Sequence, residues 1–272
     1  MPCKLIPSTR FHVTILVNMV LSSERVSFTI GTCLVHTLSY GIPNLILYFI
    51  HVNKWFAKYK IQGSDAFPEP ALIRECIKDN LVGHLVIVPL AAYFGFPVFQ
   101  SFGMTVSGPL PSGLTVLRDF VVFIAINDTL FYWVHRALHH KSIYKYIHKK
   151  HHEPKAPIGI FSKYAHPVED LLVNILPTIL GPFLIGTHCY VFWLWLAIRL
   201  FETVDAHSGY SFPYNPYHMF PFQGGADRHD FHHSHNVGCF GSFTIFWDWI
   251  TGTDKQFLEF YAKKQAESKK AA

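Results

Sequence analysis

The sequence predicts an all-α integral membrane protein with about four to five transmembrane or re-entrant helices and a cytosolic helical cap rich in histidine. Half of its 272 residues are hydrophobic, and only 15% are charged. A soluble domain carries about 25% charged residues, whereas this chain has a positive mean hydropathy of +0.21. Long uncharged runs alternate with basic segments, which is the pattern of membrane helices joined by loops.

Residues 1–110 form a predicted N-terminal membrane region. Residues 11–21, FHVTILVNMVL, are too short to span a bilayer and fit a signal-like or interfacial segment. Residues 26–50 are uncharged and long enough to cross a hydrocarbon core of about 30 Å. A second span is predicted near residues 81–102, after a basic loop.

Residues 111–272 form the second predicted domain. A third span is expected near residues 114–134, although charged side chains interrupt it. Residues 171–200 are apolar and contain helix breakers, so we predict a hairpin that is re-entrant or just crosses the membrane. The breakers are Pro177, Gly181, Pro182 and Gly186.

Lysine and arginine gather in three regions, and their distribution predicts the orientation. Residues 51–80, residues 135–170 and the C-terminal tail carry most of them, whereas residues 103–113 carry none. The positive-inside rule places all three regions in the cytosol. The final residues, KKAA, resemble the di-lysine signal that returns membrane proteins to the endoplasmic reticulum, although a solvated basic tail would look the same.

The remaining composition excludes other classes of protein. The net charge of +5 is modest, and the lysines flank apolar segments, so we read them as a topology signal and not as a nucleic-acid surface. The five cysteines are scattered without CxxC spacing, which argues against a disulfide framework or a thiolate metal site.

Three histidine clusters point to metal chemistry: HRALHH, HKKHH and HDFHH. With 18 histidines in the chain, chance predicts roughly 0.08 copies of HxxHH, whereas two are present. On a helix these offsets place imidazoles on one face, and neutral imidazole is the commonest protein metal ligand. The clustered residues are His135, His139, His148, His151, His152, His229, His232 and His233.

These imidazoles are too many for one ion, because a closed metal site uses about four ligands. The spacing therefore predicts a dinuclear site in the cap. It does not identify the element, since imidazole binds iron, copper, zinc and nickel. Isolated histidines such as His36 and His84 are expected to have packing roles.

The motifs and their surroundings resemble the fatty acid hydroxylase and sterol desaturase superfamily. The stretches YKYIHKKHHEPKAPIG, YAHPVE, ETVDAHSGYSFP, GGADRHDFHH and FWDWITGTD make the chain most similar to C-4 methylsterol monooxygenases. The resemblance runs from about Gln62 to the end of the chain. The first sixty residues add little to it beyond a membrane span.

The resemblance implies an oxidoreductase with two non-haem iron ions that uses O2. Electrons come from NAD(P)H through cytochrome b5 and its reductase, and the C-4 methyl group of a sterol precursor is oxidised to alcohol, aldehyde and acid. The eight clustered histidines should then be iron ligands, with His207 a ninth. His140, His166 and His235 adjoin the motifs as weaker candidates.

Four acidic residues are expected to orient the ligating imidazoles, because such imidazoles usually donate their second N–H to a carboxylate or carbonyl. They are Asp128, Glu169, Asp205 and Asp230. Phe192, Trp193 and Trp195 are candidates to stack on a sterol, although aromatic residues on an apolar helix more often serve packing.

Two alternatives stay open at this stage. The first is a sibling reaction on the same scaffold, namely sterol side-chain hydroxylation, sterol desaturation or fatty acyl hydroxylation. The second is a non-enzymatic membrane protein that handles metal through histidine-rich loops. The chain shows no haem-binding or flavin motif, so an oxidoreductase of this kind needs a separate electron donor. We expect it to dock near Lys149, Lys150 and Lys155.

Overall fold

The computed structural model describes residues 22–63, 66–219 and 222–271. Within these ranges the regular elements are helices, and the only pairings of extended backbone are two isolated bridges, Lys60–Tyr210 and Gln223–Thr244. The all-α prediction is confirmed. The predicted segment 11–21 lies outside the described residues.

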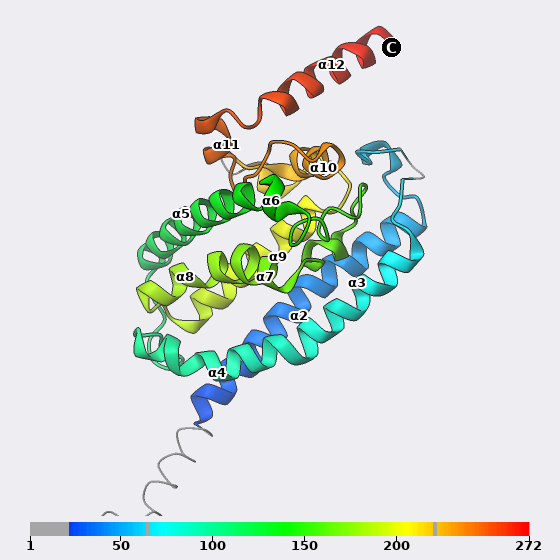
Figure 1. Cartoon of the computed structure of the whole chain (residues 1–272). Coiled ribbons are helices and arrows are strands. Elements are labelled where there is room, and N and C mark those ends of the chain that lie inside the picture. Colours follow the sequence, from blue (N-terminus) through cyan, green and yellow to red (C-terminus); the bar gives the residue numbers. More distant parts are fainter. Residues whose placement is uncertain (1–21, 64–65, 220–221, 272) are drawn as a thin grey trace, which may run out of the picture.

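Two long helical rods from the N-terminal half lie side by side along one flank of the molecule (Figure 1). The first is α2, Ser23–Val52, which begins where the Ser22 hydroxyl accepts a hydrogen bond from the backbone N–H of Arg25. The second consists of α3 (Pro70–Val82), the π-turn η2 (Gly83–Ile87) and α4 (Val88–Ser101). The two predicted spans fall on these two rods, and the second rod begins about one third of its length earlier than expected from hydropathy.

The π-turn η2 precedes a proline at the start of α4. Pro89 has no backbone N–H to donate, and its ring crowds the carbonyl one turn earlier. Widening the preceding turn to an i→i+5 pattern accommodates both effects. The same arrangement recurs where η4 (Asp170–Ile175) precedes Pro177 in α8 (Leu176–Ile185).

The predicted hairpin is formed by α8 and α9 (Cys189–Ala206), with α7 (Pro167–Glu169) and η4 leading into α8. Its turn falls at Gly186, whose φ of 64° is left-handed. A Cβ there would lie 2.1 Å from the carbonyl oxygen of Phe102, so glycine is needed on both counts. The other three predicted breakers lie inside α8 and do not end it.

Three helical stretches are long and apolar enough to cross a membrane: Ser23–Val52, Pro70–Ser101 and Pro167–Ile185. Large apolar side chains such as Leu34, Leu85 and Phe94 are more than half exposed on them, which is the surface of a protein that contacts lipid. Helix α5, Gly113–Leu138, covers the third predicted span but is not among these stretches. It buries polar side chains, including Asp119 and Asn127, against the rest of the protein.

The largest core cluster joins the two halves of the chain. Phe28 of α2 lies against Phe96 of α4, with ring centroids 5.0 Å apart, and against Phe192 of α9, with centroids 5.9 Å apart. The predicted domain boundary near residue 110 falls in the linker between α4 and α5. The division into two domains stays a prediction, because this core contains residues from both sides of it.

The cap consists of short elements at the end of the molecule where α5, α9 and the α2–α3 loop meet (Figure 1). Apart from α10 (Gly225–His235) and α12 (Lys255–Ala271), none of its helices exceeds six residues. They are η1 (Ala57–Tyr59), α6 (Lys141–Tyr144), η3 (Gly159–Lys163), η5 (Pro216–Met219) and α11 (Phe246–Thr251). The cap therefore consists largely of turns and loops between short helices.

Candidate metal centre

Five buried or half-buried imidazoles form a first group in the cap. They offer ring nitrogens that all lie within 4.8 Å of one another. Two come from the C-terminal end of α5, two from the segment after α6 and one from α10. The members are His135, His139, His148, His152 and His232.

Four further imidazoles form a second group that meets the same criterion. One comes from the segment after α6, one from the C-terminal cap of α9 and two from α10. The members are His151, His207, His229 and His233. The two groups together contain all nine histidines predicted as ligands, including His207.

The groups lie next to each other because each HH pair is divided between them. His151 belongs to the second group and His152 to the first, whereas His232 belongs to the first and His233 to the second. Neighbouring residues on a helix point about 100° apart, so one turn can supply both groups. HDFHH lies on α10 as predicted. HKKHH lies in successive turns, where the amide of His152 contacts the carbonyl of His148 at 3.4 Å.

In five imidazoles, the hydrogen bond made by Nδ1 fixes which ring nitrogen carries the proton. The Nδ1 atoms of His135, His151, His207 and His232 lie 2.7–3.0 Å from backbone carbonyl oxygens, and Nδ1 of His148 lies 2.7 Å from Glu169. A carbonyl only accepts, so each Nδ1 donates its proton to it. In the neutral ring, Nε2 then carries a lone pair. The carbonyls belong to Phe240, Tyr164, Thr203 and Gly238.

These lone pairs face each other at short distance. Nε2 of His135 and of His148 are 3.1 Å apart, and Nε2 of His151 and of His207 are 3.3 Å apart. Two acceptors cannot form a hydrogen bond, so a shared cation is the natural partner. Two nitrogens at about 2.1 Å from one ion, at right angles, would lie about 3.0 Å apart. The residues therefore fit a metal ion in each group.

Burial keeps these rings neutral, as metal ligation requires. Desolvation lowers the pKa of His151 to about 4. Desolvation, together with the neighbouring His151, lowers the pKa of His207 to about 3. For His232 and His233, burial also moves the pKa well below its usual value.

Of the four acidic residues expected to orient imidazoles, Glu169 contacts one directly. Asp128 instead accepts a hydrogen bond from the backbone N–H of Thr244 at 2.8 Å, and Asp230 accepts from Gln62 at 2.9 Å. Asp205 accepts from Asn215 at 2.7 Å. Backbone carbonyls take the role that we expected of these carboxylates, because loops 158–166 and 236–241 wrap around the imidazoles.

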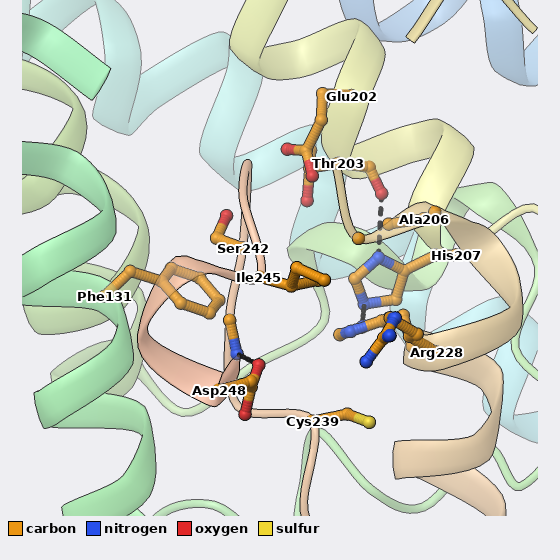
Figure 2. A pocket seen from close by; sticks show the side chains of 14 residues that line it. Phe131, Glu202, Thr203, Ala206, His207, Arg228, Cys239, Ser242, Ile245 and Asp248 are labelled. Atoms are coloured by element: carbon orange, nitrogen blue, oxygen red, sulfur yellow. Dashed lines mark hydrogen bonds between the residues drawn. The ribbon is translucent and has the colours of Figure 1, made fainter. Parts of the chain in front are cut away.

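A small cavity of about 30 Å³ adjoins the second group (Figure 2). His207 and His229 are among its lining residues, and Phe131 of α5 lies on the opposite side from His207. Glu202 of α9 points into the space between them. This is room for about two water-sized groups, so a small terminal group of a substrate, and not a whole ring system, can enter beside the imidazoles.

Comparison with known proteins places these motifs in a family. A family model described as fatty acid hydroxylase matches residues 120–253, a range that contains all nine histidines. A methylsterol monooxygenase of Arabidopsis thaliana is 38% identical over 239 residues, covering 87% of this chain and 89% of the relative. The chain belongs to the fatty acid hydroxylase family. It is accordingly an oxidoreductase.

Other relatives of this fatty acid hydroxylase chain carry two different names. A putative methylsterol monooxygenase of Dictyostelium discoideum is 37% identical over 249 residues, covering 92% of this chain and 90% of the relative. A very-long-chain aldehyde decarbonylase of Oryza sativa is 36% identical over 247 residues, covering 89% and 91%. No solved structure matches the chain.

Three histidines that adjoin the motifs of this family member have structural contacts instead of places in the two groups. His140 and His166 cap the short helices α6 and α7 by accepting backbone N–H groups, and His235 contacts Ser234 at 2.8 Å. None of the three belongs to either group. Phe192 and Trp195, which we considered for sterol stacking, are buried in the helix core.

Sequence reasoning missed one charged pair at the cavity. Arg199 forms an ion pair with Glu202 on α9, and both side chains are almost entirely buried. A signal was present in the sequence, because these are two charges in an otherwise apolar stretch and such charges are functional candidates.

Proposed function

We propose that the chain is a membrane-bound, non-haem di-iron monooxygenase that oxidises the C-4 methyl group of sterol precursors. The observation that carries the proposal is the pair of facing imidazole groups, in which tautomer-fixed lone pairs converge. The methylsterol monooxygenase relatives, which match along most of their length, support the substrate class.

The proposed ligands are the nine histidines of the two groups. His135, His139, His148, His152 and His232 would hold one ion, and His151, His207, His229 and His233 the other. Two iron ions, when bound, supply the O2 chemistry that side chains lack.

The protein has three tasks in such a reaction. The carbonyls and Glu169 hold the imidazoles in the ligating tautomer. The cavity positions one substrate carbon beside the second group, and its buried walls limit access of water. In each turnover one oxygen atom of O2 enters the C–H bond and the other leaves as water, which consumes two external electrons and two protons.

We further propose an endoplasmic reticulum location with the cap in the cytosol. The basic α2–α3 loop contacts the cap directly: the amide of Ile61 donates to the carbonyl of Gly209 at 3.0 Å, and Gln62 donates to Asp230. A positive-inside loop and the histidines therefore belong to the same side. Lys54 and Lys58 of this loop are exposed.

Cytochrome b5 and its reductase are the proposed electron donors. Of the three lysines expected at the docking face, Lys149 and Lys155 are exposed. Lys150 instead pairs with Asp79 at 2.6 Å and is less available to a partner. Reversing the charge of Lys149 and Lys155 should slow cytochrome b5-driven turnover without changing metal content, and an unchanged rate would contradict the proposed docking face.

A very-long-chain aldehyde is the second candidate substrate, because relatives with that name match as extensively as the sterol enzymes. Purified protein in lipid nanodiscs should be incubated with O2, NADPH, cytochrome b5 and its reductase, and with either a labelled 4,4-dimethyl sterol or a labelled long-chain aldehyde. Oxidation of the sterol methyl supports the proposal. Conversion of the aldehyde alone would refute it.

A further inference from the structure

The cavity beside the second imidazole group contains two carboxylates, Glu202 and Asp248. Both oxygens of Asp248 already accept hydrogen bonds, from the amides of Phe240 and Gly241 at 2.9 and 2.7 Å and from the Thr253 hydroxyl at 2.6 Å. Asp248 therefore holds the 240–241 loop. Of the two, Glu202 has more accepting capacity left for a ligand, because only its Oε2 atom is engaged.

Glu202 is held in place by an ion pair with Arg199, whose guanidinium can only donate hydrogen bonds. Its Oε2 atom pairs with Nη1 of Arg199, whose side chain is 5% exposed. Replacing a buried ion pair with apolar groups is often neutral or stabilising, so this pair is a weak device for stability. The other oxygen of the carboxylate remains for the cavity into which the side chain points (Figure 2).

A 4-methyl sterol carries a hydroxyl group that could donate a hydrogen bond to this oxygen of Glu202. A sterol carries its hydroxyl at C-3, the ring carbon next to C-4, so the hydroxyl oxygen lies about 3 Å from the methyl carbon on C-4. If the methyl group enters the cavity and faces the second imidazole group, the hydroxyl lies next to it, inside the cavity or at its mouth. The groups that line it there include Glu202 of α9 and Ser242 of the 236–245 loop.

We propose that Glu202 is a specificity-determining residue that accepts a hydrogen bond from the C-3 hydroxyl of the sterol and so turns the C-4 methyl toward the imidazoles. This rests on the proposed function. An aldehyde has an oxygen that only accepts, so a carboxylate gives it no hydrogen bond. The same residue thus favours the hydroxyl-bearing substrate over the aldehyde. Binding sites built around such a hydrogen bond strongly reject analogues that cannot form it.

The test compares three ligands on the full-length chain: a 4-methyl sterol, its 3-methyl ether and its 3-ketone. Only the first can donate a hydrogen bond. We expect the wild-type protein, with its metal bound but without reductant and in nanodiscs, to bind the alcohol about 10- to 100-fold more tightly than the ether or the ketone, as for a hydrogen bond to a charged group. Competition with radiolabelled sterol gives each Kd without requiring turnover.

The variant Glu202→Gln should abolish this preference. Arg199 only donates, so it will take the amide oxygen and leave the NH2 group facing the cavity. The three ligands, which can all accept, should then bind within about threefold of one another. The matched control is Glu259→Gln, which makes the same change on the exposed face of α12 and should preserve the wild-type ratio.

Two results would overturn the proposal, and they differ in what else they overturn. Equal binding of alcohol and ether by the wild-type protein, or a preference that survives in Glu202→Gln, refutes the role of Glu202 while sterol turnover leaves the proposed function intact. Absence of binding and of turnover for any methyl sterol, with aldehyde converted, refutes both.

Discussion

The imidazole rings of His152 and His233 stack with centroids 4.7 Å apart and planes 30° apart, although the two side chains belong to different groups. Each also has a buried Nδ1 without a hydrogen-bond partner. The stacked pair is therefore the boundary between two adjoining metal sites. A dinuclear centre requires such a boundary, because two ions that share a substrate must be close.

Because His152 and His233 belong to different groups, the structure predicts how much metal is lost when either is replaced. His152→Ala removes a nitrogen from the first group, and His233→Ala removes one from the second, so each variant should bind about one iron per chain where the wild-type protein binds two. Elemental analysis of the purified protein measures this. His140→Ala, which removes an imidazole that caps α6, should retain both ions. Equal loss in that control would contradict the assignment.

Glu169 should contribute to metal affinity although it is not one of the proposed ligands. It is 2% exposed and accepts the Nδ1 proton of His148 at 2.7 Å. Glu169→Ala removes the group that fixes the tautomer of His148, and loss of such a partner lowers metal affinity by about 10- to 100-fold. Competition with a chelator of known affinity gives the value. Glu169→Gln, whose amide oxygen still accepts, should lose less, and an equal loss would argue for a purely steric role.

Asp248 should act on the first group through the backbone. It holds the amides of Phe240 and Gly241, and the carbonyl of Phe240 accepts the Nδ1 proton of His135. Asp248→Ala releases that loop at a cost of about 1.5–3 kcal/mol per lost hydrogen bond to the carboxylate. Metal affinity of the first group should fall with it. Tight binding of both ions in this variant would show that the loop is held by other contacts.

The sequence predicted eight of the nine histidines because their spacing is local and far above chance, whereas His207 was predicted only from the family resemblance of its surroundings. It did not predict to which of the two groups each imidazole belongs, since residues 145–152 form turns without helical periodicity. The carbonyls of Phe240, Tyr164, Thr203 and Gly238 were invisible for a different reason: every residue has a carbonyl, so only the loop geometry distinguishes these four.

The acidic residues show that nearness to a histidine in the sequence is a poor guide to which imidazole a carboxylate contacts. Asp128 shares a helical face with His135 by spacing, yet it accepts a hydrogen bond from the amide of Thr244, because the 241–245 loop that precedes α11 lies against it. Glu169 lies far from the HxxHH motifs in sequence, and α7 carries it against His148. Contacts set by loops were therefore predicted poorly, whereas the helices were predicted well.

Packing of α8 on α5 gives a prediction about stability. A Cβ at Gly181 would lie 2.9 Å from Cδ1 of Phe123 and 3.1 Å from its Cα, and backbone cannot move away easily. Gly181→Ala should cost about 1–3 kcal/mol, as overpacking does. Thermal unfolding in detergent measures it. Gly41→Ala is the matched control, because nothing lies within 4 Å of its Cβ; a similar loss there would mean that the helix backbone, and not the contact, is responsible.

Removing the metal should loosen the cap and spare the membrane core. The imidazoles come from α5, the 145–152 turns, α9 and α10, and without cations their facing lone pairs repel. Chelation should therefore raise hydrogen exchange in residues 145–152 and 225–241, because ions that bind the folded state stabilise it. The core of α2, α4 and α9 around Phe28 contains none of the imidazoles of the two groups and should exchange as before. Restoring iron should reverse the change. Uniform exchange before and after chelation would mean that the carbonyl contacts hold the imidazoles in place without metal.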